Sequence, residues 1–286
     1  MSYQPSKRNS PTSMPCPNCR RLISTRSGKC IHCGYRLPGI TASVPFMETL
    51  LNERVSFVTG IIVACGFLYA MAIAMDPRAA LQFKGMYDLF APSNEALYKL
   101  GAGGLIPLTL GSWWTVLTAN YLHADLLHIL FNMLWLRQLG PLTENLYGSS
   151  RFIVIYTIAG VFGSMVSAFI GKTPLFVGAS GAVFGLFGAL IYYGLRRGGT
   201  FGSAIFRQML LWAGISLVLG FTGSGVDNWG HLGGIVGGAV AAFILGYKEQ
   251  RRQLLAHHIA ALVTLVFIAT CFVMVVYNFF WGSSIF

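Results

Sequence analysis

The sequence predicts an all-α, polytopic membrane protein that begins with a small cysteine-rich module. Of its 286 residues, 55% are hydrophobic and only 10% are charged, whereas a soluble domain typically has about 25% charged residues. The apolar residues form blocks of roughly twenty, the length of helix that spans a bilayer core. Four of the six cysteines lie in a polar stretch before the first block. These observations together set the fold class.

The region before the first block divides into three parts. Residues 1–15 are rich in proline and serine, so we expect a disordered tail. Residues 16–37 contain two CxxC pairs, and residues 38–55 are expected to form a linker. We expect no secretory signal peptide, because the chain starts with a long polar stretch.

The two CxxC pairs predict a zinc ribbon. Four thiolates at this spacing can close a tetrahedral zinc site. Such a shell leaves no open position, so the zinc is expected to be structural and to supply the folding free energy of a module with almost no core. A cytosolic partner of this ribbon is one further expectation. The expected zinc ligands are Cys16, Cys19, Cys30 and Cys33.

Seven apolar segments follow and predict seven membrane-spanning helices. The predicted segments are 56–75, 117–137, 152–171, 177–195, 208–223, 229–247 and 257–281. The first six would form a core over residues 56–247, and residues 248–286 a loop and a seventh helix. The stretch 76–116 mixes charged and apolar residues, so we expect short interfacial helices or a binding element there.

The distribution of Lys and Arg predicts the orientation. With the N-terminus inside, all but four of the 20 Lys and Arg residues fall on the inner side. Because inner loops of membrane proteins are enriched in these residues, we expect a plasma (inner) membrane protein with a cytoplasmic N-terminus and an external C-terminus. The same bias explains most of the net charge of +11, so nucleic acid is not an expected partner. It also places the four cysteines in the cytosol, where disulfides are disfavoured.

Polar side chains inside apolar segments are costly and mark candidate sites. His128 and Asn132 in the second segment are four residues apart and share a helix face. Ser180 lies near the start of the fourth segment and His231 near the start of the sixth. All three segments would enter from the outside, so this set would fall mostly in the outer half of the bilayer. That shared depth favours one joint site, although helix–helix hydrogen bonding is the alternative for the His–Asn pair.

Glycine spacing predicts that the fourth and sixth segments pack closely. Stripes of small residues let membrane helices approach almost backbone to backbone, which would bring Ser180 within reach of His231. The stripes are Gly181, Gly185 and Gly188 in the fourth segment, and Gly233, Gly234, Gly237 and Gly238 in the sixth.

These residue types can perform nucleophilic catalysis. A serine becomes a strong nucleophile when a base removes its proton, and His231 is the candidate base for Ser180. The amide of Asn132, the ring of His128 and the Ser180 backbone N–H are candidate donors to an oxyanion. We expect a Ser–His dyad without a carboxylate, because Asp227 suits a helix N-terminus better than an orienting role.

With these residues the chain resembles the rhomboid intramembrane serine proteases, of the bacterial or archaeal six-plus-one type. The family has a GxSG motif in its fourth core helix, a histidine in the sixth and HxxxN in the second. They match Gly178-Ala179-Ser180-Gly181, His231 and His128 with Asn132 here. The resemblance covers residues 56–247. It implies hydrolysis of peptide bonds in or near transmembrane segments of membrane proteins, with no cofactor for catalysis.

The resemblance also implies supporting roles. His123 would line a water-retaining region near the top of the second helix, and Glu144 would be a structural acid just after that helix. Gly234 would pack against the nucleophile helix, while Gly178 and Gly181 would free the backbone beside the serine.

Two positions depart from the family pattern. A Trp-Arg pair that is common in the first loop is Trp114-Thr115 here, so the hydrogen bonds of that arginine are lost. A tyrosine that stacks on the base histidine in many bacterial members is Phe184 here, which can stack but lacks the hydroxyl. Neither change removes a reacting group.

Two other functions remain open. A catalytically silent rhomboid-like protein would bind membrane clients without cleaving them, and the intact Ser180, His231 and Asn132 argue against it. A transporter would need acids at mid-membrane depth for ion coupling, and the predicted segments lack them.

Overall fold

The computed structural model describes residues 13–16, 18–24, 30–35, 56–82, 89–222, 225–249 and 254–281. The chain separates into two compact units, Met1–Arg54 and Val55–Phe286. The linker expected over residues 38–55 and residues 1–12 of the expected tail lie outside the described residues.

The first unit contains a two-stranded antiparallel sheet. Strand β1 (Ser13–Pro15) pairs with β2 (Leu22–Ser24), with Met14 opposite Ile23. The ribbon thus begins inside the stretch expected to be a tail. Ile23 is buried together with cysteine side chains, whereas its neighbours on β2 are exposed. Within the described residues of this unit, the hydrophobic core is therefore very small.

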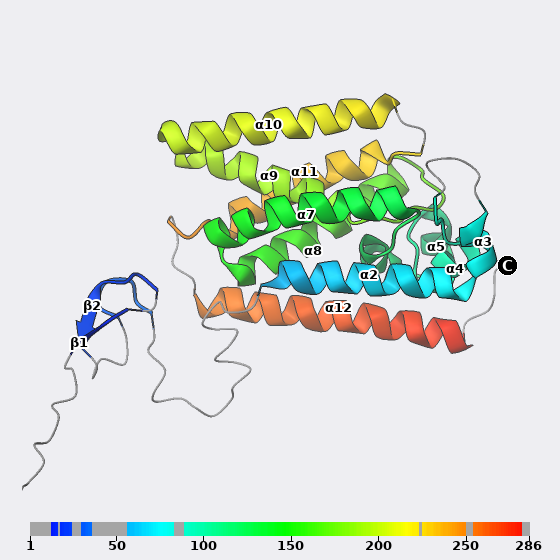
Figure 1. The fold of residues 1–286 in the computed structure, drawn as a ribbon, viewed down its shortest axis with the longest axis horizontal. Helices are drawn as coiled ribbons and strands as arrows, with labels where there is room; N and C mark the ends of the chain where they lie inside the picture. Colours follow the sequence, from blue (N-terminus) through cyan, green and yellow to red (C-terminus); the bar gives the residue numbers. More distant parts are fainter. Residues whose placement is uncertain are drawn as a thin grey trace, which may run out of the picture. The chain divides into compact units, whose positions relative to one another are not determined.

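The second unit is a bundle of long helices, which run side by side in Figure 1 with the short helices gathered at one end. The long helices are α2 (Phe57–Met75), α7 (Leu126–Tyr147), α8 (Ser149–Phe169), α9 (Ser180–Arg197), α10 (Gly199–Thr222), α11 (Asn228–Leu245) and α12 (Leu255–Trp281). The short ones are α3 (Pro77–Leu81), α4 (Asn94–Lys99), α5 (Leu105–Thr109), α6 (Thr115–Thr118) and the 3-10 helix η2 (Ala119–Tyr121). The expected short helices between the first two segments are thus confirmed.

Two predicted segments are displaced along the chain. The second was predicted at 117–137, but α7 starts only at Leu126, because the Asp125 side chain caps it by accepting from the His128 N–H at 2.8 Å. The apolar residues before it form α6 and η2 instead. The fifth was predicted at 208–223, but α10 starts at Gly199, directly after the glycine that ends α9.

Five helices in the described part are long and apolar enough to cross a membrane: α2, α8, α10, α11 and α12. Helices α7 and α9 have similar lengths but are less hydrophobic on average. Helix α9 packs among its neighbours, and its residues from Ala182 to Leu190 are all buried. A helix enclosed by protein can be less apolar than one that faces lipid. The outer helices α10 and α12 expose many large hydrophobic side chains, as a bilayer requires.

Candidate active site and metal centre

Ser180 is the first residue of α9. The segment that precedes it is hydrogen-bonded to the stretch of chain between α2 and α7. Gly103 and Phe176 exchange backbone hydrogen bonds of 3.0 and 2.7 Å, and the Gly178 N–H donates to the Ala119 carbonyl at 2.9 Å. Gly178 has a φ of +133°, a conformation that residues with a Cβ rarely adopt. The strained turn therefore needs a glycine two residues before the serine.

The N-terminus of α9 is open. Its first residues follow Ala179, which offers no side-chain cap, whereas Asp125 caps α7 and Asp227 caps α11. The first N–H groups of a helix have no intrahelical acceptor. Those of α9, beginning with Ser180, therefore face the site without a capping side chain.

His128 lies in the first turn of α7, against the turn that precedes Ser180. The Ala124 N–H donates to its Nδ1 at 3.4 Å, so we assign the proton of the neutral ring to Nε2. A Cβ atom at Gly178 would lie 2.6 Å from that Nε2 and 3.7 Å from Ser180 Oγ. The Nε2–H donor thus lies beside the serine hydroxyl.

His231 lies in the first turn of α11 and is only 7% exposed. Its ring stacks on Phe184, with 4.1 Å between ring centroids and 12° between planes. The stacking expected of Phe184 is thus confirmed. Asp227 begins the helix by accepting from the Gly230 N–H at 2.9 Å, as expected. Within the described residues, His231 Nδ1 has no hydrogen-bond partner, so the phenyl ring is what orients the imidazole.

Glycines bring the helices of Ser180 and His231 into backbone contact. A Cβ atom at Gly234 would collide with the Gly181 carbonyl oxygen, and one at Gly238 with the Gly185 carbonyl oxygen. The predicted close packing of these two helices is thus confirmed. Helix α8 joins them, because a Cβ at Gly163 would lie 2.6 Å from the Gly230 carbonyl oxygen. The sequence did not indicate this third helix.

Ser180 and His231 therefore lie at the same end of two tightly packed helices. No hydrogen bond between their side chains is present in the part of the chain that the structure describes. Catalytic hydrogen bonds are often long before substrate binds. The lack of a hydrogen bond here is therefore compatible with a Ser180–His231 dyad.

Asn132 lies one turn beyond His128 on α7 and is buried. Its Nδ2 donates to the His128 carbonyl at 2.9 Å, within the same helix. One amide N–H is therefore used locally, and the second is the one left to serve a substrate. The expected helix face shared with His128 is present, while the alternative of a helix–helix hydrogen bond is not seen among the described residues.

His123 precedes α7 and is fully buried. Its ring meets the His128 ring edge to face, at 5.2 Å between centroids. Neither ring nitrogen has a hydrogen-bond partner among the described residues. The structure thus places His123 behind His128 rather than in the helix where it was expected.

Asn120 is a buried residue that the sequence reasoning missed. Its Nδ2 donates to the Val116 carbonyl at 2.9 Å and to Ser164 Oγ at 3.3 Å. A Cβ atom at Gly160 would lie 2.6 Å from its Oδ1. Asn120 thus ties the residues before α7 to α8. An amide in the apolar run ahead of His123 was the signal that could have identified it.

Glu144 and Thr115 have structural roles. Glu144 lies in the last turn of α7, not after it, and accepts from the Phe57 N–H at 2.8 Å and the Ser56 hydroxyl at 2.9 Å. It therefore caps α2. The buried Thr115 hydroxyl donates to the Ser112 carbonyl at 2.7 Å, so its hydrogen bond is made within its own turn.

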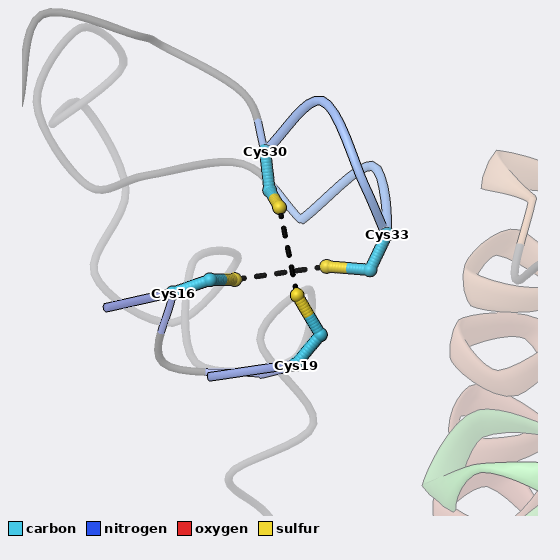
Figure 2. A group of neighbouring side chains, drawn as sticks. All are labelled: Cys16, Cys19, Cys30 and Cys33. Carbon is cyan, nitrogen blue, oxygen red and sulfur yellow. Dashed lines mark hydrogen bonds between the residues drawn. The ribbon is translucent and has the colours of Figure 1, made fainter. Parts of the chain in front are cut away.

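The four cysteines of the first unit point toward one another, as Figure 2 shows. The Cys16 and Cys33 sulfurs are 3.6 Å apart, those of Cys19 and Cys30 are 3.7 Å apart, and all four lie within 4.8 Å of one another. A tetrahedral zinc ion with Zn–S bonds of about 2.3 Å requires sulfur–sulfur distances of about 3.8 Å. The cluster therefore fits a zinc ion and could bind one.

The thiols of this cluster differ in acidity. Burial opposes ionisation of Cys30, but the backbone N–H groups of Cys33 and His32 and neighbouring thiols lower its pKa to about 6. At Cys19 a backbone hydrogen bond from Arg21 lowers the pKa, yet burial and the other three thiols raise it to about 11. Four thiolates this close repel one another, and a cation is what allows all to ionise.

Comparison with known proteins extends this picture. The Rhomboid domain family model matches residues 110–248. "Putative rhomboid protease YdcA" of Bacillus subtilis is 32% identical over 158 residues, which cover 54% of this chain and 75% of YdcA. The chain belongs to the rhomboid family. The rhomboid match contains Ser180, His231, His128 and Asn132.

Other rhomboid relatives are longer than the matched region. Rhomboid protease GluP of Bacillus subtilis is 40% identical over 157 residues, which cover 55% of this chain and 31% of GluP. RHOMBOID-like protein 7 of Arabidopsis thaliana is 36% identical over 168 residues, covering 57% of this chain and 52% of that protein. Together with its apolar helices, rhomboid membership makes this chain a multi-pass membrane protein.

Proposed function

We propose that this rhomboid-family protein is an intramembrane serine protease that cleaves peptide bonds in or near transmembrane segments of other membrane proteins. Ser180 is the nucleophile and His231 the general base of a Ser–His dyad. The observation that carries the proposal is the glycine-packed junction of α8, α9 and α11, because it sets both side chains at one end of the bundle beside His128.

The proposed reaction has two halves. Ser180 Oγ attacks the substrate carbonyl carbon while His231 takes the hydroxyl proton. The peptide C–N bond then breaks, and His231 gives that proton to the leaving amine. A water molecule next attacks the acyl-enzyme ester with His231 again as base, which releases a carboxylate product and restores the serine.

Three donors stabilise the oxyanion in this proposal. They are the His128 Nε2–H, the second amide N–H of Asn132, and the Ser180 backbone N–H at the open end of α9. Preorganised donors of this kind are typically among the largest contributions to catalysis. The positive end of the α9 dipole adds to them. Phe184 replaces the orienting carboxylate of a triad by stacking on His231.

The orientation and the N-terminal module complete the proposal. The Lys and Arg distribution supports a cytoplasmic N-terminus in the plasma (inner) membrane, which puts the site near the outer face. Residues 16–37 form a zinc ribbon with a structural zinc on its four cysteines. Residues 56–247 form the catalytic core, residues 248–286 add the loop and seventh helix, and catalysis needs no cofactor.

The direct test is cleavage of a single-span model substrate by the purified protein in lipid vesicles. Ser180→Ala should abolish cleavage, and Ser203→Ala, which removes an exposed hydroxyl on α10, should not. A serine-reactive phosphonate should label Ser180 in the wild type and fail to label His231→Ala. Equal cleavage by wild type and Ser180→Ala would disprove the assignment.

One observation favours a second function, a catalytically silent protein that binds membrane clients. Ser180 and His231 share the site without a hydrogen bond among the described residues. This function requires clients that co-purify with wild type, Ser180→Ala and His231→Ala alike, together with no cleavage and no phosphonate adduct.

A further inference from the structure

The N-terminal module is strongly basic and free of acids. Residues 1–47 contain no Asp or Glu, and the first acid of the chain is Glu48. The seven basic residues in this stretch are Lys7, Arg8, Arg20, Arg21, Arg26, Lys29 and Arg36. In the described part of the ribbon, Arg20 and Arg21 are both exposed.

Membrane orientation agrees with the sign of this charge but does not account for its position along the chain. Lys and Arg bias topology mainly within about 15–20 residues of a membrane helix, and acids contribute little to the rule. Helix α2 begins at Phe57, and Arg36 is the basic residue of the ribbon region nearest to it, 21 residues away. The lack of acids over the whole module therefore calls for another cause.

Exposed apolar side chains accompany the charge. Leu22, directly after Arg20 and Arg21, is 68% exposed, and Ile31 between two of the cysteines is 80% exposed. Burying either one would stabilise the ribbon core, yet only Ile23 among the described aliphatic side chains is buried there. Cationic residues beside exposed aliphatic ones are typical of surfaces that bind lipid headgroups.

The covalent connection keeps such a surface close to lipid. Twenty residues, 36–55, separate the described end of the ribbon from the start of the bundle. A chain of that length spans at most about 70 Å even when fully extended. The ribbon is thus confined near the bilayer, where weak contacts are favoured by a high effective concentration.

We propose that the zinc ribbon docks on anionic phospholipid headgroups at the bilayer surface from which α2 begins. Arg20 and Arg21 contact the headgroup phosphates, and Leu22 and Ile31 enter the interfacial layer. Lipid is favoured over nucleic acid because nucleic acid offers no apolar layer for these aliphatic side chains. The proposal does not depend on proteolysis. Lipid docking can therefore be disproved while the proposed protease function holds, and the protease function can be disproved while lipid docking holds.

The test uses the full chain in lipid nanodiscs, with a fluorescent amino acid at the exposed position Asn18 and headgroup-labelled quencher lipid. Quenching should be at least about twofold stronger in discs with anionic phosphatidylglycerol than in discs of neutral phosphatidylcholine, because an anionic surface attracts a basic segment. Raising the salt concentration about tenfold should remove most of the difference, since salt screens charge. Zinc content is measured in every sample to confirm a loaded ribbon.

Variants locate the contact. Arg20→Gln with Arg21→Gln should reduce the quenching in anionic discs to the neutral-disc level, and Ile31→Ser should weaken it. The control Arg78→Gln with Lys172→Gln removes two exposed charges outside the ribbon and should change nothing. Equal quenching in both lipids, or loss of quenching on adding RNA or soluble phosphate at constant ionic strength, would overturn lipid docking.

Discussion

At the scale of single residues, the geometry around Gly178 is the most demanding in the site. Its positive φ turns the chain into α9, and the space a Cβ would need is taken by the His128 ring. The proposed nucleophile, Ser180, and the proposed oxyanion donor, His128, can therefore lie side by side only because Gly178 has no side chain.

Gly178→Ala should lower cleavage about 100-fold, because displacing catalytic groups by about 1 Å has an effect of that size. Initial rates on the single-span substrate measure this. The matched control is Gly214→Ala on α10, where a new Cβ meets nothing within 4 Å. The prediction is wrong if both alanine variants cleave at the same rate.

Phe184 should act by positioning the imidazole. Phe184→Leu should slow phosphonate labelling about tenfold, because the stacking that orients His231 is lost. Phe184→Tyr should restore the wild-type rate, since the ring is kept. A merely structural role would instead lower the melting temperature of Phe184→Leu and leave the labelling rate of the folded protein unchanged.

At the scale of elements, the proposed chemistry depends on how closely the helices approach one another. Gly181, Gly185, Gly234 and Gly238 remove the side chains between α9 and α11, and Gly163 lets α8 fill the third side. This close packing of α8, α9 and α11 brings Ser180 and His231, which are distant in sequence, to the same end of the bundle.

Gly234→Ala should destabilise the bundle by about 1–3 kcal/mol, as overpacking of a filled core typically does. The added methyl meets the backbone carbonyl of Gly181, which cannot rotate away. Thermal unfolding in detergent measures the effect, with Gly214→Ala again as the control. A melting temperature equal to that of the control would contradict it.

Much of this arrangement could be predicted from the sequence. Ser180, His231, His128 and Asn132 stand out because polar groups are rare in apolar helices, and the glycine stripes predicted the α9–α11 contact. The start of α7 could not be predicted, since the run before Asp125 is as apolar as a helix interior. The contribution of α8 was missed because the polar residue beside its glycines is a serine, Ser164, and no histidine on this helix suggests catalysis.

At the scale of the whole molecule, the chain joins two units with unlike sources of stability. The bundle has an extensive hydrophobic core, whereas the described part of the ribbon buries little besides Ile23 and its cysteines. A module of that kind gains its folding free energy from metal binding.

Cys33→Ser should abolish zinc binding by the full chain, and zinc content by mass spectrometry measures it. Cleavage of the model substrate in detergent should stay within about twofold of wild type, because the two units have separate cores. Cys271→Ser on α12 is the control and should keep its zinc. Cleavage that vanishes with the metal would show that the ribbon supports the bundle directly.

The uncapped start of α9 bears on how a reaction there would end. In the proposed reaction, hydrolysis leaves a newly formed carboxylate at Ser180, where the first N–H groups of α9, which have no side-chain cap, and the positive end of the helix favour an anion. Helices α7 and α11 already have an aspartate at this position, so α9 is the one that can retain the product. Departure of the cut fragment, rather than bond breaking, would then set the turnover rate.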